Sequence, residues 1–373
     1  MSDLDSMREE IDALDKTLLE ILKKRNDVAK KVLSYKLEHQ LPVFMAEREA
    51  QKTERLRKDA REMGVDPEMV EDLLRIIMAS SRATQSQHEF PMATDEPMHV
   101  LLLGGEGGMG QLYRQFLERS GHQVSSIDKG NWYELEEVVK TIDMAIVTVP
   151  IHVTLDVIER VSAKLPDHVV LADFTSNKVT PIQAMLDAHK GPVLGLHPMH
   201  GPDVPNLSKQ LMVLCPARDS AKGSWFGEQC KLWGMRVVEA DPEAHDHAMD
   251  LVQGLRHFVA LLHGSFMKDQ ELKPQQMLDY SSPMYRAELM MTGRIFAQSA
   301  ELYADIVFSS PERRELLTQF FKHHERLAAM VESNDRAGFI KEFEAVTDFF
   351  GSFATQALFE SGYLINRLSD RFA

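Results

Sequence analysis

The chain has 373 residues, 44% hydrophobic and 27% charged, and its 42 Lys and Arg against 57 Asp and Glu give a formal net charge of −15. This composition excludes a disordered chain, and the acidic balance disfavours a general nucleic-acid binder. No apolar run reaches the roughly 18–20 residues of a membrane helix, and Cys215 and Cys230, the only cysteines, exclude a disulfide framework. We therefore expect a soluble, cytoplasmic protein of two or three domains.

Residues 1–90 differ in composition from the rest of the chain. They hold 16 Lys and Arg, 19 Asp and Glu, and one of the 20 glycines, Gly64. Their net charge is therefore −3, against −12 for the remaining residues, which hold 26 basic and 38 acidic side chains. A glycine-poor, charged segment favours helices, and the polar stretch at 84–97 is typical of a linker. These features predict a helical domain at 1–90, a second domain at 98–240 and a third at 241–373.

Apolar residues at heptad spacing predict a first helix of about 30 residues that packs on other helices. A second helix is expected at 47–63, with Gly64 as the residue that ends it. A third is expected at 67–84, with Asp66 as its N-cap and Pro67 at its first position. The ten seam positions of the first helix are Leu4, Met7, Ile11, Leu14, Leu18, Ile21, Arg25, Val28, Val32 and Tyr35.

Arg25 is the one charged residue in that seam, and a buried guanidinium needs a partner. The partner is either a carboxylate on another helix or an anionic ligand held between helices. Lys36 lies 11 residues on, about 16 Å along a helix, so both cations could flank one small dianion. Arg8 lies 28 residues from Lys36, about 42 Å on a continuous helix, and would have to serve a second site. This separation favours an antiparallel homodimer that exchanges first helices.

At these positions residues 1–90 resemble the AroQ-type chorismate mutases. The resemblance implies a three-helix protomer in an intertwined dimer, in agreement with the position of Arg8. It is carried by Met7, Arg8, Ile11, Asp12, Leu14, Asp15, Lys24, Arg25, Lys36, Pro42, Val43, Glu47, Arg48, Glu49, Ser81, Arg82, Ala83, Thr84 and Gln85.

The resemblance also implies a role for each polar residue. Arg25, Arg48 and the partner subunit's Arg8 would bind the two carboxylates of chorismate. The ether oxygen would be bonded by Lys36 and Gln85, and the hydroxyl region held by Glu49 and Ser81. Met45 stands where some of these mutases have an aspartate.

The mutase reaction is a pericyclic rearrangement to prephenate and needs no nucleophile, base or metal. The site must hold the reactive chair and place cations where the breaking C–O bond gains negative charge. Clustered Arg and Lys suit that task. The alternative is a helical arm that serves only dimerisation.

A glycine-rich loop opens the second domain. Gly105, Gly107 and Gly110 form GxGxxG directly after an apolar strand at 98–103 and before an amphipathic run at 111–120. In this setting the motif predicts a Rossmann-type dinucleotide site, with Met109 among the residues at the cofactor. Asp128 ends the next strand, 23 residues after Gly105. An acid there binds ribose hydroxyls and favours NAD over NADP, a preference that the adjacent Lys129 weakens.

Further strands are expected at 143–149, 168–172 and 193–196, each followed by a polar loop. His197 follows the last of these strands. An open α/β sheet binds ligands at the carboxyl ends of its strands, so we assign His197 as a catalytic residue at the nicotinamide end. His152 and His200 have less support and are interpreted as loop or packing residues.

Helical patterns dominate from residue 241, with helices expected at 257–268, 284–297, 311–332 and 339–370. Arg286 and Arg294 are eight residues apart, about 12 Å on one helix face. They are either substrate-binding cations or members of ordinary salt bridges. Phe349, Phe350 and Phe353 are interpreted as core or dimer interface.

The segment 98–373 resembles prephenate dehydrogenase, and the whole chain resembles the bifunctional chorismate mutase–prephenate dehydrogenases (T-protein type) of bacterial tyrosine synthesis. The residues that carry it, besides the glycine-rich loop, are Asp173, Ser176, Lys178, Gly195, His197, Pro198, Met199, Gly201, Pro202, Leu255, Arg256, His257, Phe258, Ser282, Pro283, Tyr285 and Arg286. The implied fold class is multidomain: an all-α mutase module, a Rossmann-type α/β NAD domain and an all-α C-terminal dimerisation domain.

That resemblance implies oxidative decarboxylation of prephenate to 4-hydroxyphenylpyruvate and CO₂ with NAD, and feedback inhibition by tyrosine. His197 would take the hydroxyl proton or its hydrogen bond, and Ser176 would orient His197 or the hydroxyl. Arg294 would bind a substrate carboxylate, with Arg286 and His257 nearby. No metal is expected, because no Cys, His or Asp cluster has ligand spacing. Two alternatives stay open: a dehydrogenase of arogenate or another hydroxy acid, and an NAD-sensing protein with a helical dimerisation arm.

Overall fold

The computed structural model describes residues 3–42, 44–85 and 89–372, with the side chains of 84, 85 and 370–372 outside that description. The chain divides into two compact units, residues 1–244 and residues 245–373. Within the described part, no helix is long and apolar enough to cross a membrane.

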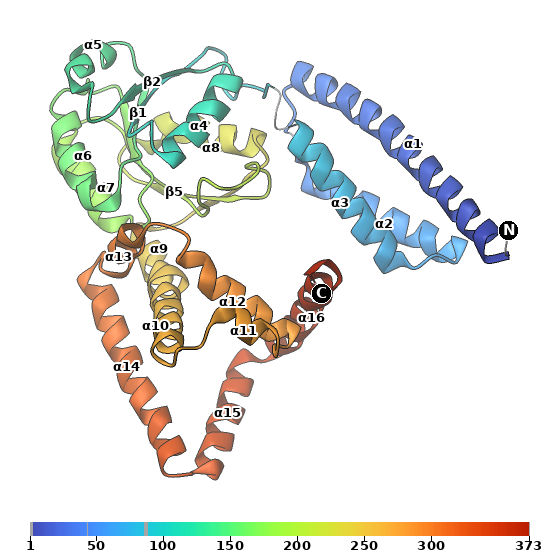
Figure 1. The fold of residues 1–373 in the computed structure, drawn as a ribbon. Coiled ribbons are helices and arrows are strands. Elements are labelled where there is room, and N and C mark those ends of the chain that lie inside the picture. The colour runs from blue at the N-terminus through green and yellow to red at the C-terminus, as the bar shows by residue number, and fades with distance from the viewer. Residues whose placement is uncertain (1–2, 43, 86–88, 373) are drawn as a thin grey trace. The chain divides into compact units, whose positions relative to one another are not determined.

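Three helices form the N-terminal part of the first unit: α1 (Asp3–Glu38), α2 (Ala46–Met63) and α3 (Pro67–Gln85) (Figure 1). Helix α1 is continuous over 36 residues, longer than predicted. The predicted ends of the next two helices are confirmed. Gly64 ends α2 in the left-handed conformation with φ 70°, and Asp66 Oδ1 accepts a hydrogen bond of 3.0 Å from the Glu68 backbone N–H at the start of α3.

The apolar seam of α1 lies exposed in the single chain. Ile11 and Leu14, near its middle, are 57% and 63% exposed. The heptad pattern predicted that this seam packs on other helices. Most of the seam is exposed in one chain, so its packing on the helices of a second chain stays a prediction. The exposed seam residues are Leu4, Met7, Ile11, Leu14, Leu18, Ile21, Val28, Val32 and Tyr35.

The remainder of the first unit is built on one sheet. In the described part of the chain, seven strands pair in the order β2-β1-β3-β4-β5-β6-β7. The first five are parallel, β6 runs antiparallel to β5, and β7 is parallel to β6. Their bounds are β1 (His99–Leu103), β2 (Gln123–Ile127), β3 (Met144–Val147), β4 (Val170–Asp173), β5 (Val193–Pro198), β6 (Leu211–Pro216) and β7 (Arg236–Glu239). The first five strands are those predicted, whereas β6 and β7 were not predicted.

Both faces of the sheet are covered by helices, which explains why its central strands are apolar throughout. Along β1, Val100 and Leu102 pack on one face, and Leu101 and Leu103 pack on the other. The first face carries α4 (Gly108–Arg119) and α8 (Ser224–Leu232). The second carries α5 (Leu135–Val138), α6 (Thr154–Ser162) and α7 (Val179–Ala188) (Figure 1). Short 3₁₀ turns lie at Trp132–Glu134, Ile151–Val153 and Ser220–Gly223.

The reversal between β5 and β6 has a consequence for the connection at 199–210. Because the two strands are antiparallel, this connection begins and ends at the same edge of the sheet. Its residues Pro202, Val204 and Pro205 line a cavity together with Gly108 and Gln111 of α4. The connection therefore lies at the edge where β1 to β5 end.

The predicted linker is only partly free of the sheet. Phe90 is buried in the core beside α4. The Gln229 side chain accepts a hydrogen bond of 2.9 Å from the Ala93 N–H and donates one of 3.0 Å to the Pro91 carbonyl. Packing against the sheet thus begins at Phe90, before the predicted start of the second domain at residue 98.

The second unit is helical. Helix α9 (Pro242–Met249) contains the division between the units and continues into a π-helix, Asp250–Leu255. It is followed by α10 (Arg256–Asp269), α11 (Pro274–Leu278), α12 (Pro283–Ile295), α13 (Ala300–Val307), α14 (Pro311–Glu332), α15 (Arg336–Phe350) and α16 (Ser352–Phe372). The single helix predicted at 339–370 is wrong, because Gly351 with φ 52° and ψ −133° separates α15 from α16. Phe349, Phe350 and Phe353 beside this break are exposed rather than part of a core.

Candidate active sites

Arg25 is half-buried between the N-terminal helices. Its Nη1 on α1 donates a hydrogen bond of 2.9 Å to Ser81 Oγ on α3. Burial lowers the pKa of the Arg25 guanidinium. Among the described residues, Arg25 bonds the Ser81 hydroxyl and no carboxylate, although a carboxylate was one of the two partners considered from the sequence. The guanidinium has further N–H donors for another acceptor.

Lysines on α1 and α2 add to the positive charge around Arg25. Burial lowers the pKa of Lys36, and the nearby Glu49 carboxylate partly opposes that shift. Burial also lowers the pKa of Lys52, and the positive charges of Arg25 and Arg48 lower it further. Lys52 therefore lies within electrostatic reach of Arg25 and Arg48, and Lys36 and Lys52 both lie within reach of Glu49. Lys52 was missed by the sequence reasoning, although it lies one helical turn beyond Arg48 and so shares its face.

The remaining predicted mutase residues divide into those near this cluster and those away from it. Glu49 on α2 forms an ion pair with Arg82 on α3. Gln85 ends α3, and its side chain lies outside the described residues. Arg8 is exposed near the start of α1, 3.6 Å from Asp5. Seventeen residues separate it from Arg25 on the same continuous helix, about 26 Å, so the two cannot contact one ligand within one chain.

This arrangement suits a small dianion. Cations that lie close together and are partly desolvated repel one another, which raises the free energy of the empty site. Binding of an anion with two carboxylates offsets that repulsion. Within the described residues, no group of His, Cys, Asp and Glu could hold a metal ion. The chemistry that such a cluster supports is electrostatic stabilisation and orientation.

The glycine-rich loop connects β1 to α4 at the carboxyl edge of the sheet. A Cβ atom on Gly110 would lie 2.6 Å from the Gly105 Cα and 2.5 Å from the Gly104 carbonyl oxygen, so the helix and loop can approach this closely only with glycine there. The loop leads into the N-terminus of α4, where backbone N–H groups favour a pyrophosphate. Met109, in the first turn, packs its side chain against the sheet core.

Asp128 lies beside the same loop. Its Oδ1 is 3.4 Å from the Glu106 backbone nitrogen, which donates to it. The Asp128 N–H in turn donates to Asn131 Oδ1 at 2.7 Å. A carboxylate next to a glycine-rich loop, at the end of the second strand, is the arrangement that binds the ribose of a dinucleotide. The residues of this edge therefore fit NAD.

His197 is buried, 4% exposed, near the end of β5. The strand extends through Pro198, so His197 lies within it, paired with Val213 of β6, rather than directly after it as predicted. Ser176 lies in the loop after the neighbouring strand β4 and is also buried. Its Oγ has no hydrogen-bond partner in the part of the chain that the structure describes.

His200 packs as the sequence suggested. Its Nδ1 donates to the Gly201 carbonyl at 3.0 Å, and its Nε2 accepts from the Tyr113 hydroxyl at 3.2 Å. Burial lowers the pKa of His200, which keeps this neutral tautomer in place.

The other predicted prephenate residues belong to the second unit. His257 is the second residue of α10, just after the π-helix, and its ring packs edge-on against Tyr303 with the ring centroids 4.8 Å apart. Burial, together with the charges of Arg256 and Arg313, lowers the pKa of His257 to about 4. Arg286 and Arg294 both lie on α12, half-buried and exposed respectively.

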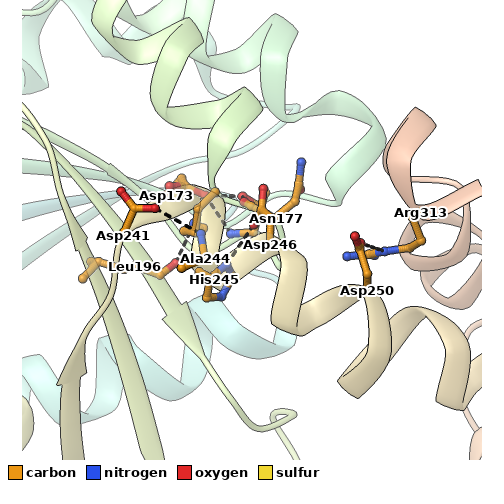
Figure 2. Close-up of polar contacts among 11 residues, drawn as sticks. Asp173, Asn177, Leu196, Asp241, Ala244, His245, Asp246, Asp250 and Arg313 are labelled. Atoms are coloured by element: carbon orange, nitrogen blue, oxygen red, sulfur yellow. Dashed lines mark hydrogen bonds and ion pairs between the residues drawn. The ribbon is translucent and has the colours of Figure 1, made fainter. Parts of the chain in front are cut away.

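A buried ion pair fixes the π-helix. Arg313 on α14 is 1% exposed and donates from Nε to Asp250 Oδ1 at 2.8 Å, as Figure 2 shows. A second nitrogen of the same guanidinium donates to the Ile306 carbonyl. Gly254, in the π-helix, leaves room for the Arg313 side chain, because a Cβ there would lie 2.5 Å from its Cδ. A π-helix held in this way is typical of a functional site.

Comparison with known families divides the chain into three matched segments. Residues 7–86 match chorismate mutase type II. Residues 119–234 match the nucleotide-binding domain of prephenate dehydrogenase, and residues 241–345 match its dimerization domain. The glycine-rich loop precedes the second segment, so its assignment rests on geometry.

Two relatives match the chain over nearly its full length. The T-protein of Enterobacter agglomerans is 38% identical over 370 residues, 99% of both chains. The T-protein of Haemophilus influenzae is 37% identical over 370 residues, 99% of this chain and 98% of that one. The crystal structure of Aquifex aeolicus prephenate dehydrogenase with hydroxyphenyl propionate and NAD⁺ covers 68% of this chain and 96% of its own, with a TM-score of 0.54 and 17% identity. That likeness shows a shared fold.

The fold and these matches define a bifunctional enzyme, a chorismate mutase joined to an NAD-dependent prephenate dehydrogenase. The chain belongs to the T-protein family. It rearranges chorismate to prephenate and converts prephenate to 4-hydroxyphenylpyruvate and CO₂ with NAD, in tyrosine biosynthesis. The predicted family, fold class, paired activities and cofactor are confirmed.

Proposed function

We propose that the mutase reaction is carried by the cation cluster around Arg25. Arg25, Arg48 and the partner subunit's Arg8 bind the two carboxylates of chorismate, and Lys36 with Gln85 bonds the ether oxygen. Glu49 and Ser81 hold the hydroxyl region. The observation that carries this proposal is the Arg25–Ser81 hydrogen bond within a cluster of partly desolvated cations. Such a cluster stabilises the charge that develops on the breaking C–O bond.

The dehydrogenase reaction is assigned to His197 and the residues around it. NAD⁺, when bound, supplies the acceptor for the hydride that leaves the hydroxyl-bearing ring carbon. Gly105, Gly107, Met109 and Gly110 form its pyrophosphate cradle, and Asp128 binds the adenosine ribose.

His197 takes the proton from the prephenate hydroxyl as that carbon is oxidised, and returns it to the same oxygen when loss of CO₂ makes the ring aromatic. Ser176, whose buried Oγ is unpartnered in the described structure, orients the imidazole or the hydroxyl. Arg294 binds a substrate carboxylate, with Arg286 and His257 as further contacts. Half-buried and neutral at pH 7, His257 serves as a hydrogen-bonding group.

The assembly is a homodimer that exchanges first helices. The exposed apolar seam of α1 supports this proposal, because a second copy of the helix is the partner that a self-complementary heptad seam fits. The position of Arg8, beyond reach of its own chain's Arg25, supports it independently. Tyrosine acts as feedback inhibitor, as the family resemblance implies.

The remaining proposals concern domain bounds and location. The domains are residues 1–90, 98–240 and 241–373. The enzyme works in the cytoplasm, a location supported by two buried cysteines that form no disulfide.

A coupled assay tests the assignment of both sites. Chorismate and NAD⁺ are supplied together, and chorismate loss and NADH formation are followed in one reaction. We expect chorismate to disappear first and NADH to appear after a lag that added prephenate abolishes. With arogenate in place of prephenate we expect little NADH. Turnover of arogenate alone would instead support the rival substrate, and absence of any turnover would support an NAD-binding protein with a helical arm.

A further inference from the structure

A buried ion pair lies beside His197, outside the residues so far given a role. Lys178 and Asp173 are both 0% exposed, and the Lys178 ammonium bonds the Asp173 carboxylate. A charged pair without contact to water costs desolvation free energy that hydrophobic residues would not incur. A specific reason for the pair therefore has to be sought in what else it contacts.

The Lys178 ammonium also donates a hydrogen bond of 2.8 Å to the carbonyl oxygen of Leu196. Leu196 immediately precedes His197. The parallel ladder between β4 and β5 ends at the pair formed by Asp173 and Gly195. Beyond that point β4 offers β5 no further backbone partner, and the Lys178 side chain supplies the missing donor to the next carbonyl of β5.

The Asp173 carboxylate ties the same ammonium to the loop that carries Ser176. Asp173 Oδ2 accepts hydrogen bonds from the Thr175 N–H at 3.0 Å and from the Thr175 hydroxyl. Thr175 Oγ1 also bonds the Asn177 carbonyl at 2.9 Å. The residues on both sides of Ser176 are therefore anchored to the carboxylate that holds Lys178.

We propose that the Lys178–Asp173 pair positions His197 against Ser176 for the dehydrogenase reaction. One ammonium joins the backbone at His197 to the anchored loop at Ser176, so the imidazole and the hydroxyl keep a fixed separation. Lys178 is a positioning residue, because it bonds the Asp173 carboxylate and acts on His197 through the Leu196 carbonyl. The proposal rests on the proposed roles of His197 and Ser176.

The test replaces both charges together, because removing only one would leave an unpaired buried charge and destabilise the fold. In the double variant Lys178→Met with Asp173→Asn, we expect the dehydrogenase kcat to fall about 10–100-fold, the effect of a small misplacement of a catalytic group. The Kd for NAD⁺ and the KM for prephenate should change less than about twofold. The mutase activity of the same chain should be unchanged, and so reports on folding. Lys190→Met, at an exposed lysine just after α7, is the matched control.

Combination with His197→Asn separates positioning from a general structural effect. If the pair acts through His197, adding the double variant to His197→Asn should reduce kcat by less than about threefold further. The proposal would be overturned if the kcat losses of His197→Asn and of the double variant multiply in the combined variant. It would also be overturned if the double variant alone keeps full kcat. Should the double variant fail to fold, Lys178→Arg decides. The larger, planar guanidinium of arginine keeps the positive charge but displaces Leu196. A reduced dehydrogenase kcat with intact mutase activity therefore supports the proposal, and a full kcat overturns it.

The same set of variants distinguishes this proposal from the assignment on which it rests. Full kcat in His197→Asn would remove His197 from the mechanism. If His197→Asn lowers kcat and the double variant at Lys178 and Asp173 does not, His197 remains a catalytic residue. That result would overturn only the positioning role of the ion pair.

Discussion

Arg25 on α1 donates a hydrogen bond of 2.9 Å to Ser81 on α3, although the two residues are 56 positions apart in the chain. This contact joins the first and third helices at the centre of the cation cluster. It leaves the remaining guanidinium donors available to a carboxylate. Arg25 is thus held in place before any ligand arrives, which is the condition under which a cation lowers a barrier most.

The first prediction concerns Arg25→Ala. The mutase kcat/KM should fall by at least about 100-fold, because a preorganised cation is removed from the developing charge. The dehydrogenase rate measured with prephenate should be unchanged. Arg55→Ala is the control, since Arg55 is an exposed cation on α2, 3.9 Å from Asp59. Comparable mutase rates in both variants would contradict the assignment.

The second prediction concerns the exchanged helices. Arg8→Ala and Arg25→Ala should each be inactive as mutases. If every site combines Arg8 from one chain with Arg25 from the other, a mixed dimer contains one intact site of two. An equimolar mixture, allowed to exchange subunits, should then recover about a quarter of wild-type mutase activity. No recovery, with exchange confirmed by mass spectrometry of differently tagged chains, would exclude sharing of sites between subunits.

The third prediction concerns Lys52. Burial and the charges of Arg25 and Arg48 lower its pKa, so its charge is lost at a lower pH than that of an ordinary lysine. Lys52→Met should raise the KM for chorismate about 3–10-fold at neutral pH, a value discounted for partial exposure. The difference from wild type should shrink as pH rises, because wild-type Lys52 then loses its proton too. The control is Lys58→Met, an exposed lysine on α2, and an unchanged KM in Lys52→Met would show that Lys52 does not contact the substrate.

The fourth prediction concerns His197→Asn. Loss of the proton acceptor should lower the dehydrogenase kcat by about 10²–10⁴ while the Kd for NAD⁺, measured by fluorescence, stays the same. His168→Asn, at an exposed histidine before β4, should keep full activity. A proportional loss of NAD⁺ affinity would mean that the substitution damages the cofactor site and not the proton transfer.

The fifth prediction concerns pH and His257, whose pKa in the folded protein is about 4. The unfolded chain binds a proton at this histidine below an ordinary pKa of about 6.5, whereas the folded chain does not until about pH 4. The folded state therefore loses stability as pH falls through that window. Wild type should lose more Tm between pH 7 and pH 5 than His257→Gln. Equal losses would contradict a half-buried imidazole that stays neutral in the folded state.

The sequence was most informative where a feature depends on neighbouring residues. The end of α2 at Gly64 and the cap of α3 at Asp66 involve backbone groups within a few positions. The glycine-rich loop and Asp128 belong to one strand–helix–strand unit with fixed spacing. These features were predicted correctly because the physics that specifies them is local.

Features that depend on packing were not predicted. The heptad seam of α1 was correctly recognised as apolar, but the sequence did not reveal that it lies exposed in the single chain. The importance of Lys52 depends on the face that α2 turns toward Arg25. Lys178 and Asp173 were noted only as motif positions, since the hydrogen bond from Lys178 to the Leu196 carbonyl joins the start of α7 to β5. The break at Gly351 was missed because apolar residues continue on both sides of it.

The reversal of β6 returns the chain to the dehydrogenase edge of the sheet. The connection at 199–210 is anchored in the sheet at both ends and lies along the edge where His197 is found. The connection is also tied to the rest of the domain, because Leu207 is buried in the core and His200 bonds the Tyr113 hydroxyl of α4. A sequence change in this segment would therefore be transmitted to α4 and to the hydrophobic core, and would not stay confined to the surface of the domain.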